Sequence, residues 1–447
     1  MRIRILYNVS AMQDYVIGID VGGTNIKAGA VDHQGNLLAQ RKAPTEAGSG
    51  SEAILARIAG LVRDLQSDCS DRRLKAAGFG IPGAIRSKTG IVTQAPNVPA
   101  WDGQPIRKML EDHTGVPCFI ENDANAIALG EMWVGSGRGY NHIVALTLGT
   151  GVGGGVIVDG KLLRGADGMA SELGHIAVQA DGPRCHCGSN GCLESYSSAT
   201  GILRMYREAL KAGRNTSLQR FPEAEVTTQL IHQHAHLGDL LSRELLETAG
   251  KQLGVALASL VNMFNPEILV IGGGVAAAWD MIMPPAIRAM NHRAFKAPAE
   301  RVQIVRAEKE EIAGIFGAAY VAWDRLQHPD PVIAHEHRNT PWGSWEVIEE
   351  TPEYKVKRLY VHPGHRLSYQ KHELREETWM IASGEATITL DGEEIKLNAG
   401  QTIHIRKTQA HRIANFGNAP LIFLEVQRGS YFGEDDIVRL QDDYKRS

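Results

Sequence analysis

The segment CHCGSNGCLE, residues 185–194, places three cysteines and a glutamate within ten residues. The whole chain has 447 residues and only five cysteines, and His175 precedes the segment by ten positions. So tight a cluster does not have the spacing of a secreted disulfide framework, and in a reducing cytoplasm it favours a metal site. The segment is otherwise polar and rich in glycine, so it holds too little apolar surface to order itself by burial.

Composition narrows the class of protein. With 43% hydrophobic and 22% charged residues, the chain is typical of globular proteins with two or three domains. A net charge of −4 without a basic block argues against nucleic acid as a main partner. The sequence has no run of about 18 apolar residues, which argues against a membrane span. Residues 1–13 lack the features of a signal peptide, so we expect an N-terminal extension and a cytoplasmic protein.

Apolar strands followed by glycine-rich turns recur in the first part of the chain. YVIGID (15–20) and HIVALTLG (142–149) both run into such a turn. A helix with an apolar stripe is predicted at residues 51–67. The repetition predicts a duplicated α/β fold over residues 14–326, with two lobes that meet near residue 119 and a cleft between them.

The pattern changes beyond that region. Residues 327–340 are rich in proline and histidine without periodicity, which is typical of a linker. Residues 341–447 consist of short apolar stretches divided by turns, and Asp391-Gly392 has the composition of a tight hairpin turn. An all-β sandwich or barrel is therefore predicted there.

Three glycine-rich turns are candidate phosphate sites, because glycine lets backbone N–H groups approach phosphate oxygens. None of them has the P-loop spacing G-x-x-x-x-G-K-[ST], and one such turn alone fits a plain hairpin equally well. Three of them after apolar strands favour phosphate binding. The candidate residues for nucleotide and Mg²⁺ are Asp20, Gly22, Gly23, Thr24, Lys27, Gly149, Thr150, Gly151, Gly273 and Gly274.

Asp123 lies at a strand-to-helix junction in ENDANAIALGE, residues 121–131. The structural alternative for it is a helix N-cap. As a general base, an aspartate beside a sugar hydroxyl would accept its proton during phosphoryl transfer, which contributes roughly 10²–10⁴-fold to the rate. Positioning and Mg²⁺ would supply most of the remaining acceleration.

Together, DVGGTNIKAG (20–29), ENDANAIALGE, LTLGTGVGGG (146–155) and CHCGSNGCLE resemble the ROK family of sugar kinases and related repressors over residues 14–326. The resemblance implies a two-lobed actin-like ATPase fold that binds ATP and a sugar between its lobes. It also implies that Asp123 is the catalytic base. The sugar contacts that it implies are Asn97, Asn122, Glu172, His175 and Glu194.

The cysteine segment is then predicted to bind a structural metal ion. The set suited to tetrahedral Zn²⁺ is His175, Cys185, Cys187 and Cys192. Because protein side chains fill all four coordination positions, we expect a structural ion that holds Glu172 and Glu194 against the sugar. The alternative is that the cysteines bind no metal and pack as small buried residues. A ROK repressor is the rival class, but it would carry a helix-turn-helix before the first strand, and only about fifteen residues precede it. The presence of Asp20 and Asp123 also favours catalysis.

A second metal site is predicted in the β-rich region. The spacing of glycines, histidines and a glutamate after Gly364 is that of the two cupin motifs, with a glutamine in place of the first histidine. Residues two apart on a strand share a face, so Gln370 and His372 point the same way. Mixed nitrogen and oxygen ligands suit Zn²⁺, Mn²⁺ or Fe²⁺, and a metal-free module is the alternative. The predicted ligands are Gln370, His372, Glu377 and His411.

Residues 341–444 closely resemble the type II mannose-6-phosphate isomerase cupin, in TPWGSWEVI, LSYQKHELREETW and GQTIHIRKTQAHRIANFG. The resemblance implies that a proton moves between C2 and C1 of an open-chain sugar phosphate beside the metal. The implied phosphate or enediolate contacts are Lys371, Arg375 and Arg412. Leu374 and Thr378 stand where histidine is common, so the sequence does not name the proton-transfer residue.

The two halves together predict a bifunctional enzyme. It would phosphorylate a hexose at O6 with ATP, mannose being the best candidate, and then isomerise mannose 6-phosphate to fructose 6-phosphate. The alternative is a kinase for glucose, fructose or an N-acetylhexosamine with a non-catalytic, sugar-binding cupin. The expected partners are small molecules and a second copy of the chain in a dimer, without nucleic acid or membrane.

Overall fold

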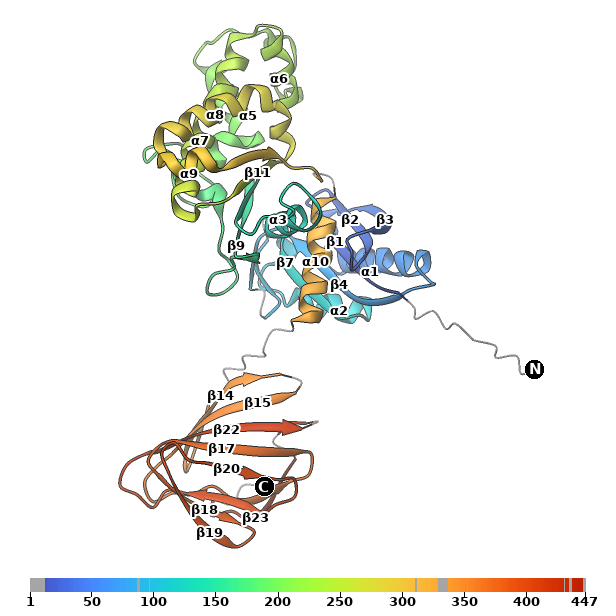
Figure 1. Cartoon of the computed structure of the whole chain (residues 1–447). Coiled ribbons are helices and arrows are strands. Elements are labelled where there is room, and N and C mark those ends of the chain that lie inside the picture. Colours follow the sequence, from blue (N-terminus) through green and yellow to red (C-terminus); the bar gives the residue numbers. More distant parts are fainter. Residues whose placement is uncertain are drawn as a thin grey trace, which may run out of the picture. The chain divides into compact units, whose positions relative to one another are not determined.

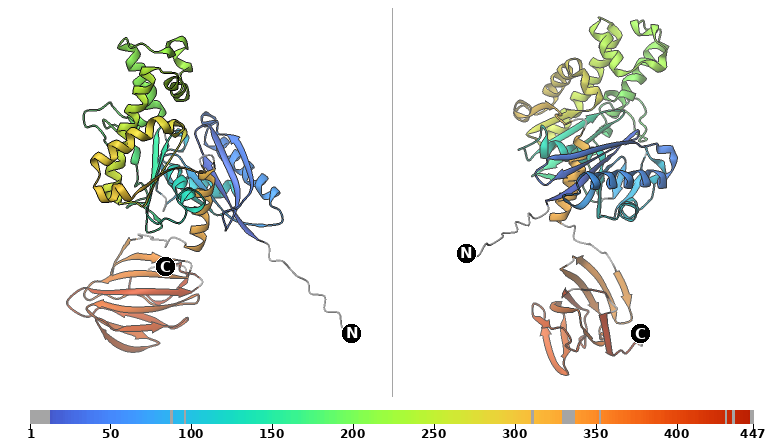
Figure 2. Two further views of the ribbon diagram at one scale, coloured as in Figure 1. Left: turned by 45° about the horizontal axis from the view of Figure 1, so that its top comes forward. Right: turned by 90° about the vertical axis from the view of Figure 1, so that its right-hand side faces the viewer.

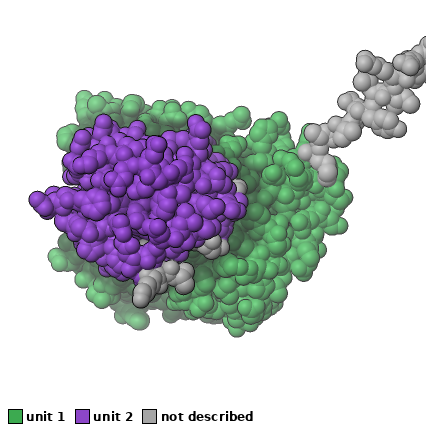
Figure 3. Space-filling model, turned by 90° about the horizontal axis from the view of Figure 1, so that it is seen from below, with its two compact units in different colours: residues 1–327 green, residues 328–447 purple. Residues whose placement is uncertain are grey.

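The computed structural model divides into two compact units, residues 1–327 and residues 328–447 (Figure 3). Residues 1–12 of the predicted extension and residues 329–336 of the predicted linker lie outside the described residues. The structure describes residues 13–86, 89–95, 97–309, 312–328, 337–351, 353–429, 431–433 and 436–444.

The first unit contains two five-stranded sheets and a separate strand pair (Figure 1). The strands of the first sheet are β1 Asp14–Val21, β2 Asn25–Asp32, β3 Leu37–Pro44, β4 Arg73–Ile81 and β7 Cys118–Asn122. Those of the second sheet are β8 Ile143–Leu148, β9 Val152–Val158, β10 Lys161–Leu162, β11 Ile268–Gly272 and β12 Gln303–Arg306. The separate pair is β5 Ala84–Arg86 with β6 Ile91–Gln94.

The two sheets have the same topology. The strand orders are β3-β2-β1-β4-β7 and β10-β9-β8-β11-β12. In each sheet the first strand pairs antiparallel with the next in sequence and parallel with a later one, as β1 does with β2 and β4, and β8 with β9 and β11. The predicted duplication of an α/β unit is confirmed. The boundary predicted near residue 119 falls within β7, which pairs with β4 in the first sheet, so that sheet extends to Asn122.

Helices cover both faces of the first sheet, so that its central strands are buried and read as continuous apolar runs. On one face Ile17 of β1 lies in a core with Leu55, and on the other face Val16 lies in a core with Ile315. The helices of this lobe are α1 Ser51–Asp68, α2 Ile106–Thr114, α3 Asp123–Val134 and α10 Ala313–Gln327.

Helix α10 is the last element of the first unit, yet it packs against the first sheet (Figures 1 and 2). The approach is close enough to require glycine. A Cβ atom on Gly18 of β1 would lie 1.9 Å from the carbonyl oxygen of Ile315, and one on Gly317 would lie 1.5 Å from that of Ala126 in α3. The helix therefore fixes β1 and α3 relative to each other.

The second lobe is mainly helical outside its sheet. Helices α7 and α8 pack on the second sheet, in a core that joins Leu257 and Ile282 to Leu146. Asn265 ends α7 in a left-handed conformation with φ 46°, which asparagine tolerates, and Pro266 follows it. None of the described helices is both long and apolar enough to span a bilayer. The helices of this lobe are α4 Glu194–Ser197, α5 Ala199–Lys211, α6 Thr228–His236, α7 Leu240–Phe264, α8 Trp279–Arg293 and α9 Lys296–Arg301.

The second unit consists of two sheets that enclose one core, in which Trp345 and Phe423 of one sheet pack with Ile388 of the other. The first sheet comprises β13 His337–Thr340, β14 Gly343–Glu350, β15 Tyr354–Val361, β17 Arg375–Ser383, β20 Thr402–Ile405 and β22 Leu421–Gly429. The second comprises β16 Tyr369–His372, β18 Glu385–Leu390, β19 Glu393–Asn398, β21 His411–Ala414 and β23 Ile437–Gln441.

The strand composition of this unit follows the predicted pattern. Asp391 and Gly392 join β18 to β19 with φ of 49° and 91°, as a two-residue hairpin turn requires. The described residues form a two-sheet sandwich, one of the two predicted alternatives, and no closed barrel is found among them. Residues 337–340, which the sequence assigns to the linker, form β13 because they pair with β14.

Candidate functional site

Two aspartates lie at the carboxyl ends of parallel strands in the first sheet. Asp20 is near the end of β1, and Asp123 begins α3 directly after β7, with β4 between the two strands. Burial and the neighbouring charges of Asp20 and Glu172 raise the pKa of Asp123 to about 6. A carboxylate with a pKa near the working pH is what general base catalysis requires.

The surroundings of Asp20 are also set by the fold. Burial raises the pKa of Asp20, and Lys27, its register partner on β2, lowers it. Gly314 in the first turn of α10 lies so close that a Cβ atom there would be 2.7 Å from Asp20 Cγ. The first turn of α10 therefore lies beside this carboxylate.

The first glycine turn is anchored by Thr45, a buried residue that the sequence pattern does not single out. Thr45 Oγ1 donates to the Gly22 carbonyl oxygen at 2.6 Å, and its backbone N–H donates to the Thr24 carbonyl oxygen at 2.8 Å. The predicted sugar contact Asn97 lies beside the turn, because a Cβ atom on Gly23 would be 3.4 Å from Asn97 Cβ. The structure thus brings Asn97 to the candidate phosphate turn.

The second and third glycine turns follow neighbouring parallel strands, β8 and β11. Gly273 has φ 91°, and a Cβ atom there would lie 2.5 Å from the Leu148 carbonyl oxygen, so only glycine fits. The Thr150 carbonyl oxygen accepts a hydrogen bond from Thr200 Oγ1 at 2.8 Å. Gly149–Gly151 and Gly273 therefore lie at one edge of the second sheet.

The structural alternative for Asp123 is that it caps helix α3. Asn122 and not Asp123 is the residue that caps this helix. Asn122 Oδ1 accepts from the backbone N–H groups of Ala124 and Asn125 at 2.9 and 3.0 Å. Its Nδ2 donates to the Gly83 carbonyl oxygen at 3.0 Å. The side chain predicted to contact a sugar hydroxyl is thus already engaged in fixing the start of the helix that carries Asp123.

The four predicted zinc ligands converge in the second lobe, with their ligand atoms within 4.8 Å of one another. His175 Nδ1 lies 3.7 Å from Cys185 Sγ, and Cys187 Sγ lies 3.6 Å from Cys192 Sγ. A tetrahedral Zn²⁺ with Zn–S bonds of about 2.3 Å separates two sulfur ligands by roughly 3.8 Å. The residues present therefore fit a structural zinc ion.

Glu194 links this cluster to the second glycine turn. Its Oε2 accepts from the Val152 backbone N–H at 3.0 Å, and its Oε1 lies 3.9 Å from Cys185 Sγ. The pKa of Glu172 is raised, mainly by burial and also by the charge of Glu194, whereas His175 acts in the opposite direction. Glu172, His175 and Glu194 are therefore close enough to interact, and their contact with a sugar stays a prediction.

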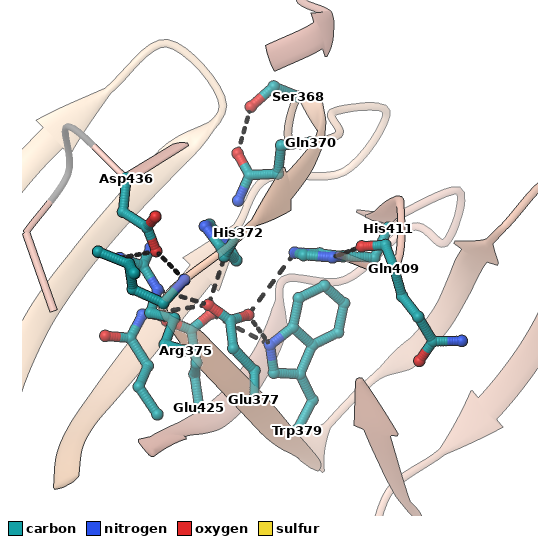
Figure 4. A network of polar contacts seen from close by, with 12 residues as sticks. Ser368, Gln370, His372, Arg375, Glu377, Trp379, Gln409, His411, Glu425 and Asp436 are labelled. Atoms are coloured by element: carbon teal, nitrogen blue, oxygen red, sulfur yellow. Dashed lines mark hydrogen bonds and ion pairs between the residues drawn. The ribbon is translucent and has the colours of Figure 1, made fainter. Parts of the chain in front are cut away.

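Three of the predicted cupin ligands form a buried cluster in the second unit (Figure 4). His372 Nε2 lies 3.1 Å from Glu377 Oε1, and His411 Nε2 lies 3.7 Å from Glu377 Oε2. They come from three strands, β16, β17 and β21. His411 Nε2 is buried without a hydrogen-bond partner among the described residues. A buried imidazole nitrogen of this kind beside a carboxylate fits a divalent metal ion.

Surrounding donors orient the Glu377 carboxylate. The groups that donate to it are Arg375 Nε at 3.3 Å, Trp379 Nε1 at 3.0 Å and Gln427 Nε2 at 3.2 Å. Burial opposes ionisation of Glu377, but His372, His411 and the arginine outweigh it and hold its pKa well below the usual range. Burial lowers the pKa of His411. An ionised carboxylate and a neutral imidazole are the forms that bind a metal.

Gln370 lies on the same side of β16 as His372 (Figure 4). Together with Glu377 it lines a cavity of about 60 Å³. Its Oε1 accepts from Ser368 Oγ at 2.7 Å, which leaves the second lone pair of that oxygen for a metal.

Lys371 and Arg412 lie beside the ligands His372 and His411 in sequence, but they point away from them. Adjacent residues on a strand face opposite sides of the sheet. Accordingly, the guanidinium of Arg412 lies over the ring of Tyr369, 5.5 Å from its centroid. Of the three predicted substrate contacts in the cupin, the structure brings only Arg375 to the metal-ligand cluster.

Comparison with known proteins decides the family. Residues 16–325 match the ROK family, and residues 328–442 match the C-terminal domain of mannose-6-phosphate isomerase. The chain belongs to the ROK family. It is 37% identical over 313 residues to a glucokinase of Thermotoga maritima, in an alignment that covers 70% of this chain and 98% of that protein.

Solved structures of the ROK family agree with this assignment. The ROK hexokinase of Thermus thermophilus matches with a TM-score of 0.61 and 33% identity, over 70% of this chain and 99% of that one. A ROK glucokinase of Streptomyces griseus, in complex with glucose and AMPPNP, matches with a TM-score of 0.60 and 32% identity, over 69% and 99%. These likenesses confirm the actin-like fold and support a sugar kinase in the first unit, which we call the ROK unit.

The ROK unit also contains a buried carboxylate that the sequence motifs do not single out. Glu131 of α3 is fully buried, and it accepts from the backbone N–H groups of Lys309 and Ser136, each at 2.9 Å. These bonds hold the segment that leads into α10, whose first turn faces Asp20. An acidic residue within the apolar run of ENDANAIALGE was the available signal, since such a residue is seldom buried without a partner.

Proposed function

We propose that the ROK unit transfers the γ-phosphoryl group of ATP to the O6 hydroxyl of a hexose. The observation that carries the proposal is Asp123, whose raised pKa places it near the value of an efficient base. Asp123 accepts the hydroxyl proton, and the glycine turns donate backbone N–H groups to the nucleotide phosphates. Asp20 is the residue that would hold Mg²⁺ through a water molecule, and Mg²⁺ supplies charge neutralisation at the phosphates.

The cysteine cluster supports the sugar side of this proposal. With Nδ1 of His175 directed at Cys185, its Nε2 remains for a sugar hydroxyl. Glu172 and Glu194 accept hydrogen bonds from other hydroxyl groups. The zinc would fix the segment between them, since Glu194 begins α4 two residues after the last cysteine ligand. The dimer, the cytoplasmic location and the absence of a nucleic-acid partner stay predictions.

The rate of phosphorylation is expected to rise with pH through about 6. The raised pKa means that Asp123 is still partly protonated near that pH, and a protonated carboxyl cannot accept the hydroxyl proton. Below pH 6, kcat should fall tenfold per pH unit, and above pH 7 it should be level. Initial rates at saturating ATP, Mg²⁺ and hexose from pH 5 to pH 8 measure this. A profile that stays flat down to pH 5 would contradict it.

We also propose that the second unit isomerises mannose 6-phosphate to fructose 6-phosphate, so that the ROK unit acts on mannose. The support is the family match over residues 328–442 together with the cluster of His372, Glu377 and His411. A divalent metal there would polarise the oxygens of the open-chain sugar while a proton moves between C2 and C1. Arg375, which reaches Glu377, fixes the carboxylate in that cluster.

Leu374 and Thr378, which stand where histidine is common, do not belong to this cluster. Thr378 follows Glu377 on β17 and therefore faces the other side of the sheet, where its Oγ1 lies 3.2 Å from Nδ1 of the exposed His404. Leu374 is 43% exposed. The departure from the usual histidine-rich sequence thus leaves the three buried ligands intact.

A product analysis tests both proposals. With ATP and mannose, the wild type is expected to form fructose 6-phosphate, whereas His372→Ala stops at mannose 6-phosphate with an unchanged kinase rate, because it loses a metal ligand. The matched control is His404→Ala, an exposed histidine on β20, which should behave as the wild type. NMR spectra of the products identify them. Turnover of glucose without turnover of mannose would favour the alternative, a glucokinase with a sugar-binding cupin.

A further inference from the structure

A third group of metal-ligating side chains lies on the helices of the second lobe. His232 and His236 are four residues apart on α6, so their side chains share one face of the helix. Asp280, the second residue of α8, lies against the same face. Neither the proposed kinase chemistry nor the cupin uses these residues.

The three side chains meet at short distances. His232 Nε2 lies 2.9 Å from Asp280 Oδ1, and His236 Nε2 lies 3.0 Å from Asp280 Oδ2. The two Nε2 atoms lie 3.1 Å from each other. Both Nε2 atoms therefore lie beside the Asp280 carboxylate, each nearest to a different oxygen, and one ligand atom from each residue lies within 4.8 Å of the others.

Two protonation states fit this triangle. If both Nε2 atoms carry a proton, each donates to a different oxygen of Asp280. If both are unprotonated, their lone pairs and the carboxylate oxygens converge with no hydrogen between them, which is the arrangement of a metal site. A single cation between the three atoms satisfies all of them at once, because imidazole nitrogen and carboxylate oxygen are both ligands of Zn²⁺.

The distances also suit such an ion. Tetrahedral Zn²⁺ with bonds of about 2.0–2.1 Å to nitrogen and oxygen separates its ligand atoms by roughly 3.3 Å. The side chains of His236 and Asp280 are 54% and 51% exposed, so water has access to the fourth position. Three protein ligands and one water would then complete the coordination.

We propose that His232, His236 and Asp280 bind a divalent transition metal ion, with Zn²⁺ as the best candidate. Imidazole ligands favour Zn²⁺, Ni²⁺ or Cu²⁺ over Mg²⁺, which prefers oxygen. The ion joins α6 to the first turn of α8. Since Asp280 follows the short helix Gly274–Ala278 with one residue between, the ion also holds the chain that leaves the third glycine turn.

Zinc counting on the full-length protein tests the proposal. The zinc present after purification is measured by elemental analysis, and further uptake is measured by calorimetric titration with ZnSO₄. The total is expected to be one equivalent per chain lower in His236→Gln than in the wild type. His292→Gln, an exposed histidine on α8, is the matched control and should keep the wild-type total. An equal total in His236→Gln and the wild type would overturn the site.

A second variant separates loss of the site from a damaged fold. Asp280→Asn removes the ligand on the other helix, and this variant should also bind one equivalent of zinc less than the wild type. Titration with MgCl₂ should show no uptake in any variant. Thermal unfolding in the presence of a chelator should be the same for all variants. Added Zn²⁺ should raise the unfolding temperature of the wild type more than that of His236→Gln or Asp280→Asn. An equal rise in all three contradicts the proposal.

Discussion

Replacing Asp123 with asparagine is expected to lower kcat for hexose phosphorylation by about 10³-fold, within the range for loss of a general base. The amide has nearly the same shape and keeps the start of α3, because Asn122 and not Asp123 caps that helix. It cannot accept the hydroxyl proton. The KM for the hexose should change little, since the group acts on the reacting hydroxyl and not on the other hydroxyl groups.

Initial rates with the preferred hexose measure the effect, and circular dichroism checks the fold. Asp167→Asn is the matched control, because Asp167 is exposed in the same unit and should leave kcat unchanged. The variant should also lose the pH dependence near 6, which belongs to the missing carboxyl. A kcat within tenfold of the wild type would remove Asp123 from the role of base.

Replacing Cys187 with serine is expected to lower kcat/KM for the hexose by at least about 100-fold. This effect is larger than the usual effect of losing a residue that only hydrogen-bonds to a metal ligand. A three-ligand site binds zinc weakly, and metal binding supplies the free energy that orders a segment so poor in apolar side chains. Without that order, Glu194 leaves both the sugar and the Val152 N–H, at which its Oε2 accepts at 3.0 Å. The KM for ATP should therefore rise as well.

Elemental analysis should show the loss of zinc, and a lower unfolding temperature should accompany it. Cys69→Ser is the matched control, because Cys69 is a buried cysteine at the end of α1, outside the cluster. It should keep its zinc and the wild-type KM values. Purified, active wild-type protein without zinc at this cluster would end the proposal that an ion orders the sugar-binding segment.

The parts of the fold that the sequence predicts are those with local causes. A buried strand that ends in glycine turns, the Asn265-Pro266 helix end and the Asp391-Gly392 hairpin each follow from backbone preferences of a few residues. The His-Cys₃ cluster was also predictable, because its ligands lie within one short segment. The alternation of side chains along a strand is itself a sequence-level argument against placing Lys371 and Arg412 in the cupin cluster.

The missed features depend on contacts between distant segments. Thr45 supports the first glycine turn from 23 residues away, and Glu131 holds Lys309 from 178 residues away. Thr45 has no local signature, and the position of Glu131 in an apolar run indicates burial but not its partner. The assignment of β7 depends on the same kind of contact. This strand is apolar and could belong to either sheet, and its pairing with β4 places it in the first.

The position of α10 has a consequence for the order in which the protein acquires its structure during synthesis. β1 ends at Val21, whereas the helix that covers one of its faces begins at Ala313. Until that helix leaves the ribosome, Val16, Val31 and Ala76 have no cover from it and are available to chaperones or to aggregation. Both lobes must therefore be synthesised before α10 can cover the first sheet, and the β-rich unit is synthesised only after that.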